Sequence, residues 1–340
     1  MTLLFVDGFD HVDDGFELLK WDAYATEFGI AYASTYGLDG GWGIRFDSNA
    51  SYYLQKNLAA NESTVIVGGY FKVDTLNSSN EFLNFLDSGT SQVEVRAMSD
   101  GSIAVYRGTT LLAQSSIGLV SAVAWFNLGV KVTFSQTVGQ ITVKLGPTTI
   151  INTAANLDTC ASANEYANNV RIYSNGGFTY VDHFYLANTT AGKVADIVQG
   201  LKIATLYPDA DGAVVQFTPS SGSNYQTIDE QQLTGTTDYN SSSTVGHKDR
   251  FSMGTFSGLG AIYGVQIVGA VSNPDAGTVV MRSLVYSGTV PAEVEGSDFT
   301  TTATPKAMMT VHEQEPTDTV DWTASKVNAA EFGYKFQSAT

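Results

Sequence analysis

Short apolar runs separated by turn residues recur along the whole chain, and this alternation is the feature that most constrains the fold. The runs are rich in β-branched and aromatic residues, and they recur at about one per 8–12 residues, a spacing typical of antiparallel sandwiches. The pair Asp100-Gly101 lies between two alternating runs and predicts a tight hairpin. Hydrophobic residues make up 43% of the chain, enough for a packed core, and the 33 glycines allow many turns. Together with the short apolar runs, this composition predicts an all-β chain.

Two distant runs are predicted partners. Residues 3–10 and residues 180–186 both have the composition of strands, and the first and last strands of an antiparallel sandwich commonly lie side by side. We therefore expect residues 1–190 to form one jelly roll, residues 191–200 a linker, and residues 201–340 a second, smaller β-sandwich. In the second domain, strands are predicted over residues 201–207, 213–218, 249–256, 262–271, 279–287, 307–313 and 331–336. Thr323 is the predicted cap of a short helix over residues 324–330.

Charge and cysteine usage exclude several classes of partner. The net charge of −17 is spread over both halves, so the clustered cations that bind nucleic acid are missing. Cys160 is the one cysteine, which rules out an intrachain disulfide and a cysteine zinc site. The start of the chain lacks a cationic segment, and no apolar run approaches about 18 residues, so we expect neither a secretory signal nor membrane insertion.

Several motifs carry a family resemblance. They are DGFD at residues 7–10, WFNLGVKV at residues 125–132, ITVKL at residues 141–145 and VDHFYL at residues 181–186, followed by similar segments near residues 205–212 and 322–333. In this order the chain resembles the concanavalin-like or laminin-G-like jelly roll of proteins encoded by tailed bacteriophages. The motifs are strand and turn patterns and not catalytic signatures, so they indicate a family better than an activity.

The resemblance implies a structural protein of the phage particle, placed on the tail or decorating the capsid and assembled in the host bacterial cytoplasm. Its partners would be other virion proteins, with a homo-oligomer expected and a trimer suggested by analogy. Contact with a glycan of the host surface is a further expectation. The alternatives are a lectin-like module for host recognition and a polysaccharide depolymerase.

The chain is expected to be no enzyme and to need no cofactor. Glycosidases of concanavalin-like fold place carboxylates two residues apart on one strand, typically as Glu-x-Asp-x-Glu, and this pattern is missing. Two Glu-x-Glu pairs, at residues 293–295 and 313–315, lie beside prolines, where loops are expected. No Gly-x-Ser-x-Gly motif accompanies the four histidines. His183 is predicted to be packed and hydrogen-bonded, and His11 and His312 to lie at the surface.

Two weak sets of binding candidates remain. Asp209 and Asp211 resemble the start of a calcium loop, although turn-forming aspartates explain the same letters, and the cluster Asp7, Asp10, Asp13 and Asp14 is open to the same objection. Trp42, Tyr52 and Tyr53 are candidates for stacking on a glycan, with core packing as the alternative. Gly68-Gly69 suggests a bend within a strand.

Overall fold

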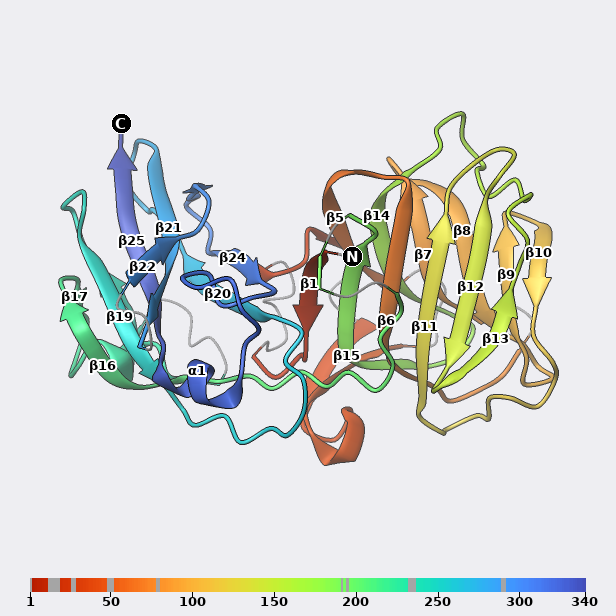
Figure 1. Ribbon diagram of the computed structural model, residues 1–340, viewed down its shortest axis with the longest axis horizontal. Helices are drawn as coiled ribbons and strands as arrows, with labels where there is room; N and C mark the ends of the chain where they lie inside the picture. Colours follow the sequence, from red (N-terminus) through yellow and green to blue (C-terminus); the bar gives the residue numbers. More distant parts are fainter. Residues whose placement is uncertain are drawn as a thin grey trace. The chain divides into compact units, whose positions relative to one another are not determined.

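Two β-sandwich units make up the chain, and each is described by itself (Figure 1). The computed structural model describes residues 2–11, 19–25, 29–47, 52–77, 80–190, 192–193, 196–231, 237–288 and 292–340. Unit 1 is Met1–Ile203 and unit 2 is Ala204–Thr340. Nearly all regular structure in both is β, which confirms the expected fold class. Within the described ranges no helix is both long and apolar enough to cross a membrane.

Unit 1 is a jelly roll of two antiparallel sheets. The eight-stranded sheet has the order β13 (Thr148–Asn152), β12 (Gln140–Leu145), β11 (Phe126–Thr133), β6 (Thr64–Val73), β15 (Thr179–Asn188), β4 (Gly43–Phe46) and β3 (Ile30–Ala33), with β1 (Leu3–Asp7) also paired to β15. The seven-stranded sheet has the order β10 (Thr110–Gln114), β9 (Ile103–Arg107), β8 (Thr90–Ala97), β7 (Glu81–Asp87), β14 (Ala167–Asn175), β5 (Tyr52–Glu62) and β2 (Ala23–Tyr24).

The core of unit 1 lies between these two layers, which Figure 1 shows stacked face to face. Alternate residues of each strand point inward, and rings from the two sheets meet there: Phe71 of β6 lies 5.2 Å from Phe82 of β7 between ring centroids. Both rings are fully buried. The predicted hairpin at Asp100-Gly101 joins β8 to β9, and Gly101 has a φ of +75°, which favours glycine.

The predicted pairing of the first and last strands is confirmed. β1 runs antiparallel to β15, with Phe5 opposite Leu186 and Asp7 opposite Phe184. β4 pairs with β15 on the same side as β1, and β6 pairs with it on the other side. The last strand of unit 1 is therefore an interior strand, with partners along both of its edges.

The glycine pair of β6 accommodates an aromatic ring. The ladder with β11 runs through Gly68 and Gly69 without interruption. A Cβ at position 68 would lie 2.1 Å from the ring of Tyr185. The close approach of this ring requires glycine at position 68, and the ladder with β15 shifts its register beside the glycine pair, between Asp182 and Tyr185.

Residues 196–203, called the strap below, cross the outer face of the eight-stranded sheet. Ile197 is buried against Gly129 of β11. Val198 exchanges two hydrogen bonds with the hydroxyl of Tyr185, at 2.8 and 3.0 Å. The backbone N–H of Ile203 donates to Nδ1 of His183 at 3.1 Å, which confirms the packed, hydrogen-bonded histidine.

Unit 2 is a smaller sandwich. Its main sheet has the order β16 (Pro208–Val215), β19 (Lys248–Met253), β25 (Glu331–Ala339), β21 (Val279–Ser287) and β22 (Ala292–Glu295), with β23 (Phe299–Thr300) also paired to β21. β20 (Val265–Val271) pairs with β24 (Lys306–His312), and β17 (Thr218–Pro219) pairs with β18 (Asn240–Ser241). Two buried clusters, around Trp322 and around Met308, fill the interior.

Local predictions in unit 2 have mixed outcomes. Helix α1 (Ala324–Ala329) is capped by Thr323, whose Oγ1 accepts from the N–H of Lys326 at 3.3 Å, as predicted. The strand predicted over residues 201–207 is wrong, because this segment forms no ladder and regular pairing begins at Pro208. Its first residues belong to the strap, and Leu206 packs against the buried cluster around Trp322.

Candidate functional site

The outer face of the seven-stranded sheet carries an unusual set of polar and aromatic side chains. Asn84 of β7 lies opposite Glu94 of β8 and opposite Arg171 of β14. Directly paired residues point to the same face of a sheet, and residues two apart on one strand do so too. The register therefore places together the residues called the polar face below: Tyr53, Gln55, Glu81, Asn84, Ser91, Glu94, Arg96, Tyr106 and Arg171.

A chain of hydrogen bonds links the carboxylates of this face. Asn84 Nδ2 donates to Glu81 Oε1 at 2.9 Å. Ser91 Oγ lies 2.8 Å from Asn84 Oδ1 and 3.0 Å from Glu94 Oε1, so it bridges the two strands. The guanidinium of Arg96 donates to Glu94 Oε2 at 2.5 Å. These contacts hold Glu81 and Glu94 in fixed positions relative to each other.

Two arginines lie against tyrosine rings at the margins of the polar face. The Arg96 guanidinium is 4.3 Å from the ring centroid of Tyr106, and that of Arg171 is 4.1 Å from the ring centroid of Tyr53. Arg171 Nε also donates to Gln55 Oε1 at 2.7 Å. Stacking on a ring immobilises a guanidinium while leaving its edge able to donate hydrogen bonds.

The centre of the polar face is shielded from water. Glu81 and Glu94 are each 8% exposed, and Asn84 is 7% exposed. Burial, together with the nearby charge of Glu94, raises the pKa of Glu81 to about 7, against the opposing effect of Arg96, the Asn84 hydrogen bond and Arg171. Glu81 is therefore a carboxyl group that changes its protonation near neutral pH. Such a group can donate as well as accept a proton or a hydrogen bond.

The three aromatic candidates from the sequence are not brought together. Tyr53 belongs to the polar face, whereas its neighbour Tyr52 points the opposite way along β5, with its ring against Gly29. Trp42 precedes β4 and so belongs to the other sheet; it is half-buried. The role of all three in glycan stacking stays a prediction, and Tyr53 is the one that lies among polar partners.

The aspartates proposed for calcium have other surroundings. Asp209 and Asp211 lie exposed on β16, in a strand and not a loop, and Asp211 accepts from the N–H of Tyr225 at 2.8 Å. Across the described part of the chain, no group of three or more His, Cys, Asp or Glu side chains is placed to hold a metal ion. Asp13 and Asp14 lie outside the described residues.

Asp7 is the hub of a buried group at the N-terminus. Its carboxylate accepts from Lys20 Nζ at 3.2 Å, from Trp21 Nε1 at 2.9 Å and from the N–H of Phe9 at 2.9 Å. Burial alone would raise the pKa of Asp7, but Lys20, His11 and the two hydrogen bonds hold it below its usual value. Its three partners give this aspartate a structural role.

The remaining sequence candidates are structural as well. Glu293 and Glu295 lie on β22, so the expected loop is wrong there. Glu295 binds Arg282 and Lys335, each at 2.6 Å, in cross-strand ion pairs. Glu315 lies in the expected loop and accepts from Thr317 and Asp318, which fixes the turn.

Two histidines differ from expectation. His11 was predicted at the surface, yet its side chain is only 15% exposed, and burial lowers its pKa to about 4. The His312 side chain is also mostly out of water, and burial lowers its pKa. Neither lies on the polar face.

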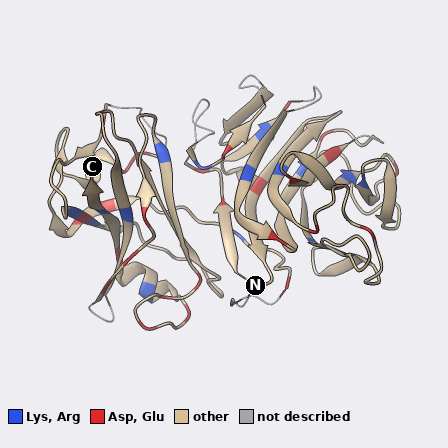
Figure 2. Cartoon of the chain, turned by 90° about the horizontal axis from the view of Figure 1, so that it is seen from above, with Lys and Arg blue, Asp and Glu red and all other residues tan. Residues whose placement is uncertain are grey.

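Sequence reasoning missed Glu81 and Glu94 because they lie on two strands. A search for carboxylates two residues apart on one strand does not find a pair that the β7–β8 hairpin brings together. The signal was present in residues 92–97, QVEVRA, where charged residues alternate with the inward-facing Val93 and Val95. Figure 2 shows acidic and basic positions distributed over the strands and loops of each unit.

Comparisons with known proteins find likeness in structure only. No protein-family model matches the chain, and no curated protein matches it significantly. Similar solved structures include a prokaryotic β-1,3-1,4-glucanase (lichenase) from a mouse hindgut metagenome, with 9% identity, TM-score 0.38, and coverage of 55% of this chain and 100% of that one. A carbohydrate-binding module of Bacillus subtilis has 10% identity, TM-score 0.33, and coverage of 49% and 96%. A galectin of Caenorhabditis elegans has 8% identity, TM-score 0.30, and coverage of 42% and 96%. None of these likenesses assigns a function to the chain.

Proposed function

We propose that the chain is a glycan-binding protein and that the polar face is its binding surface. The observation that carries the proposal is the composition of this face, where tyrosine rings, guanidinium groups, amides and carboxylates lie together on adjacent strands. Tyrosine rings offer apolar surface to sugar rings, and fixed polar groups exchange hydrogen bonds with sugar hydroxyls. Because these side chains already hold one another, they lose little conformational freedom when a glycan binds.

A glycan array followed by titration calorimetry tests this proposal. Tyr53→Ala removes a ring from the polar face and is expected to weaken binding about tenfold or more, in line with the loss of a stacking contact and its arginine partner. Tyr239→Ala, at a half-exposed tyrosine of unit 2, is the matched control and should leave binding unchanged. Binding that is lost in Trp42→Ala but kept in Tyr53→Ala would place the surface on the other sheet and contradict the proposal.

The sequence resemblance supports a finer proposal for where the protein acts. In this proposal the chain is a structural component of a tailed-bacteriophage particle, on the tail or as a decoration, made in the host cytoplasm. It contacts other virion proteins, forms a homo-oligomer, and binds host glycan without cleaving it. Antibody labelling of purified particles tests the location, and a chain that is absent from the particle would refute it. Light scattering of the purified chain tests the trimer.

A second candidate is hydrolysis of the bound glycan, and one observation favours it. Glu81, with a pKa of about 7, is linked through Asn84 and Ser91 to a second carboxylate, Glu94. A carboxylic acid still protonated at neutral pH can act as a general acid while a second carboxylate acts on the sugar. Release of reducing ends that is abolished in Glu81→Gln, with binding retained, would support cleavage. If no bound glycan yields reducing ends, the non-enzymatic role stands.

A further inference from the structure

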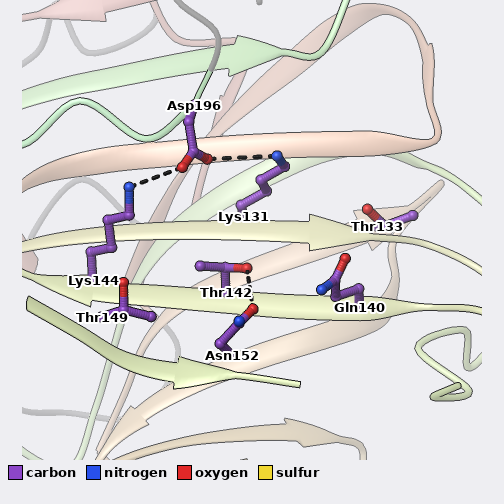
Figure 3. A pocket seen from close by; sticks show the side chains of 8 residues that line it. All are labelled: Lys131, Thr133, Gln140, Thr142, Lys144, Thr149, Asn152 and Asp196. Carbon is purple, nitrogen blue, oxygen red and sulfur yellow. Dashed lines mark hydrogen bonds and ion pairs between the residues drawn. The ribbon is translucent and has the colours of Figure 1, made fainter. Parts of the chain in front are cut away.

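A second polar hollow lies on the opposite sheet of unit 1, away from the polar face. It occupies about 340 Å³ over the outer face of β11, β12 and β13. Figure 3 shows its lining, made of two ammonium groups, three hydroxyls, two side-chain amides and one carboxylate: Lys131, Lys144, Thr133, Thr142, Thr149, Gln140, Asn152 and Asp196. This volume is in the range of small-ligand sites, which span about 300–1,000 Å³.

The three strands together are positively charged, whereas the chain as a whole is acidic. The protein carries 34 acidic residues against 17 basic ones, yet β11, β12 and β13 contain two lysines and no Asp or Glu. Lys131 and Lys144 stand on adjacent strands and point to the same face, since Lys131 pairs with Thr142, two residues before Lys144. These three strands alone therefore present two neighbouring cations and no anion.

Among the described lining residues the one carboxylate, that of Asp196, comes from the strap. Asp196 Oδ2 accepts from Lys144 Nζ at 2.9 Å, and Oδ1 lies 3.5 Å from Lys131 Nζ, so the two ammonium groups bracket one carboxylate (Figure 3). Burial alone would raise the pKa of Asp196, but the Lys144 hydrogen bond and both lysine charges hold it below its usual value. The next residue, Ile197, is only 6% exposed, which keeps Asp196 tethered at this place.

The bracketed carboxylate is more exposed to water than either lysine that binds it. The side chain of Asp196 is 47% exposed, while those of Lys144 and Lys131 are 21% and 29% exposed. Ion pairs at such exposure contribute little, because water and salt screen them. An incoming carboxylate can therefore take the place of Asp196 without leaving a buried charge unpaired.

The other lining residues define what the incoming carboxylate is attached to. Thr142 Oγ1 donates to Asn152 Oδ1 at 3.3 Å, and Gln140 Nε2 donates to the carbonyl of Thr153 at 3.0 Å, so hydroxyls and amides continue along β12 and β13 from the two lysines. Among the described residues that line the hollow, none is aromatic. This lining suits a ligand covered with hydroxyl groups better than an apolar acid.

We infer that this hollow binds the carboxylate of an acidic sugar, such as a uronic-acid unit of a polysaccharide, and that Asp196 occupies the carboxylate position when no ligand is bound. The strap then acts as a built-in competitor. Lys131 and Lys144 bind the ligand's carboxylate, and Thr142 and Asn152 bind its hydroxyls. The site lies on the other sheet from the polar face and does not depend on it.

Titration calorimetry with trigalacturonate at low salt and neutral pH tests this inference on the full chain, with galactotriose as the neutral counterpart. Asp196→Asn removes the competitor and is expected to bind trigalacturonate about fivefold more tightly, the size of effect that one half-exposed ion pair exerts. The double variant Lys131→Gln/Lys144→Gln is expected to lose the binding, and a thermal melt confirms that it is folded. Asp22→Asn, which frees Lys56 from an ion pair of 3.0 Å elsewhere in unit 1, changes the net charge equally and should leave affinity unchanged.

Two results would overturn the inference. One is an affinity of Asp196→Asn equal to or below that of the native chain. The other is equal binding of the neutral trisaccharide, which would show that the lysines do not read the carboxylate. Tyr53→Ala, which disables the polar face, should leave trigalacturonate binding intact, so failure of this inference and failure of the proposed function are distinguishable.

Discussion

Glu81→Gln should make unit 1 more stable at alkaline pH than the native chain, and the size of the gain follows from its burial. The ordinary pKa of this carboxyl is 4.5, and burial beside Glu94 raises it to about 7. At about 1.4 kcal/mol per pH unit, the difference corresponds to about 3 kcal/mol. Because the folded state binds the proton more tightly than the unfolded state, this stability is fully present below pH 4.5 and is lost as pH rises towards 7.

The assay is urea denaturation followed by tryptophan fluorescence at pH 5 and at pH 8. Glutamine keeps an oxygen that accepts from Asn84 but carries no charge, so the free energy of unfolding of the variant should lack this pH dependence. We expect the variant to gain about 3 kcal/mol over the native chain at pH 8 and much less at pH 5. Glu62→Gln, which removes the same charge at the far end of β5, is the control. A gain of equal size at both pH values would refute the reasoning, because the ionised form of Glu81 would then not be the destabilising one.

Three other substitutions test buried contacts of the two units. Gly68→Ala should lower the free energy of unfolding of unit 1 by about 1–3 kcal/mol, because the new Cβ meets the Tyr185 ring at 2.1 Å, and calorimetry of Gly68→Ala/Tyr185→Leu should show partial recovery. Asp7→Ala should lower the free energy of unfolding of unit 1 by about 3–5 kcal/mol, because Lys20 is then buried without its carboxylate partner. If the double variant Asp7→Ala/Lys20→Met does not recover most of the lost Tm, the unpaired charge is not the cause. Asp249→Ala should lower the free energy of unfolding of unit 2 by about 3 kcal/mol or more. The substitution removes the acceptor of four donors: the N–H groups of Gln216 and Phe217 and the side chains of Asn224 and Tyr334. Equal stability of the variant and the native chain in urea would contradict this.

Much of the fold is readable from local sequence patterns. Alternating residues and turn glycines predict individual strands and hairpins, because side-chain period and backbone conformation are set by a few neighbouring residues. The hairpin at Asp100-Gly101, the strand β21 and the cap at Thr323 are of this kind. Pairing of β1 with β15 was predictable only because closing a sandwich requires partners for its terminal strands.

The strap and the polar face could not be predicted in the same way. Residues 201–207 contain apolar residues at strand spacing, but residues 201–203 belong to the strap, which lies on the outer face of an existing sheet. No local sequence feature distinguishes such a covering segment from a paired strand. Glu81 and Glu94 meet only once the register of β7 and β8 is known. A slip of one residue would turn either side chain to the core, so the site depends on a long list of pairings that no short window contains.

The position of β15 has a consequence for how the protein is made. This strand, at residues 179–188, lies between β6 on one side and β4 and β1 on the other, so the middle of the sheet is synthesised after its flanks. Until the ribosome has released it, β1 and β4 have no bridge to β6, and β6 presents an apolar edge to its surroundings. Nascent chains halted before residue 179 should therefore be chaperone clients, and chains only slightly longer than the first unit should fold to a protease-resistant form.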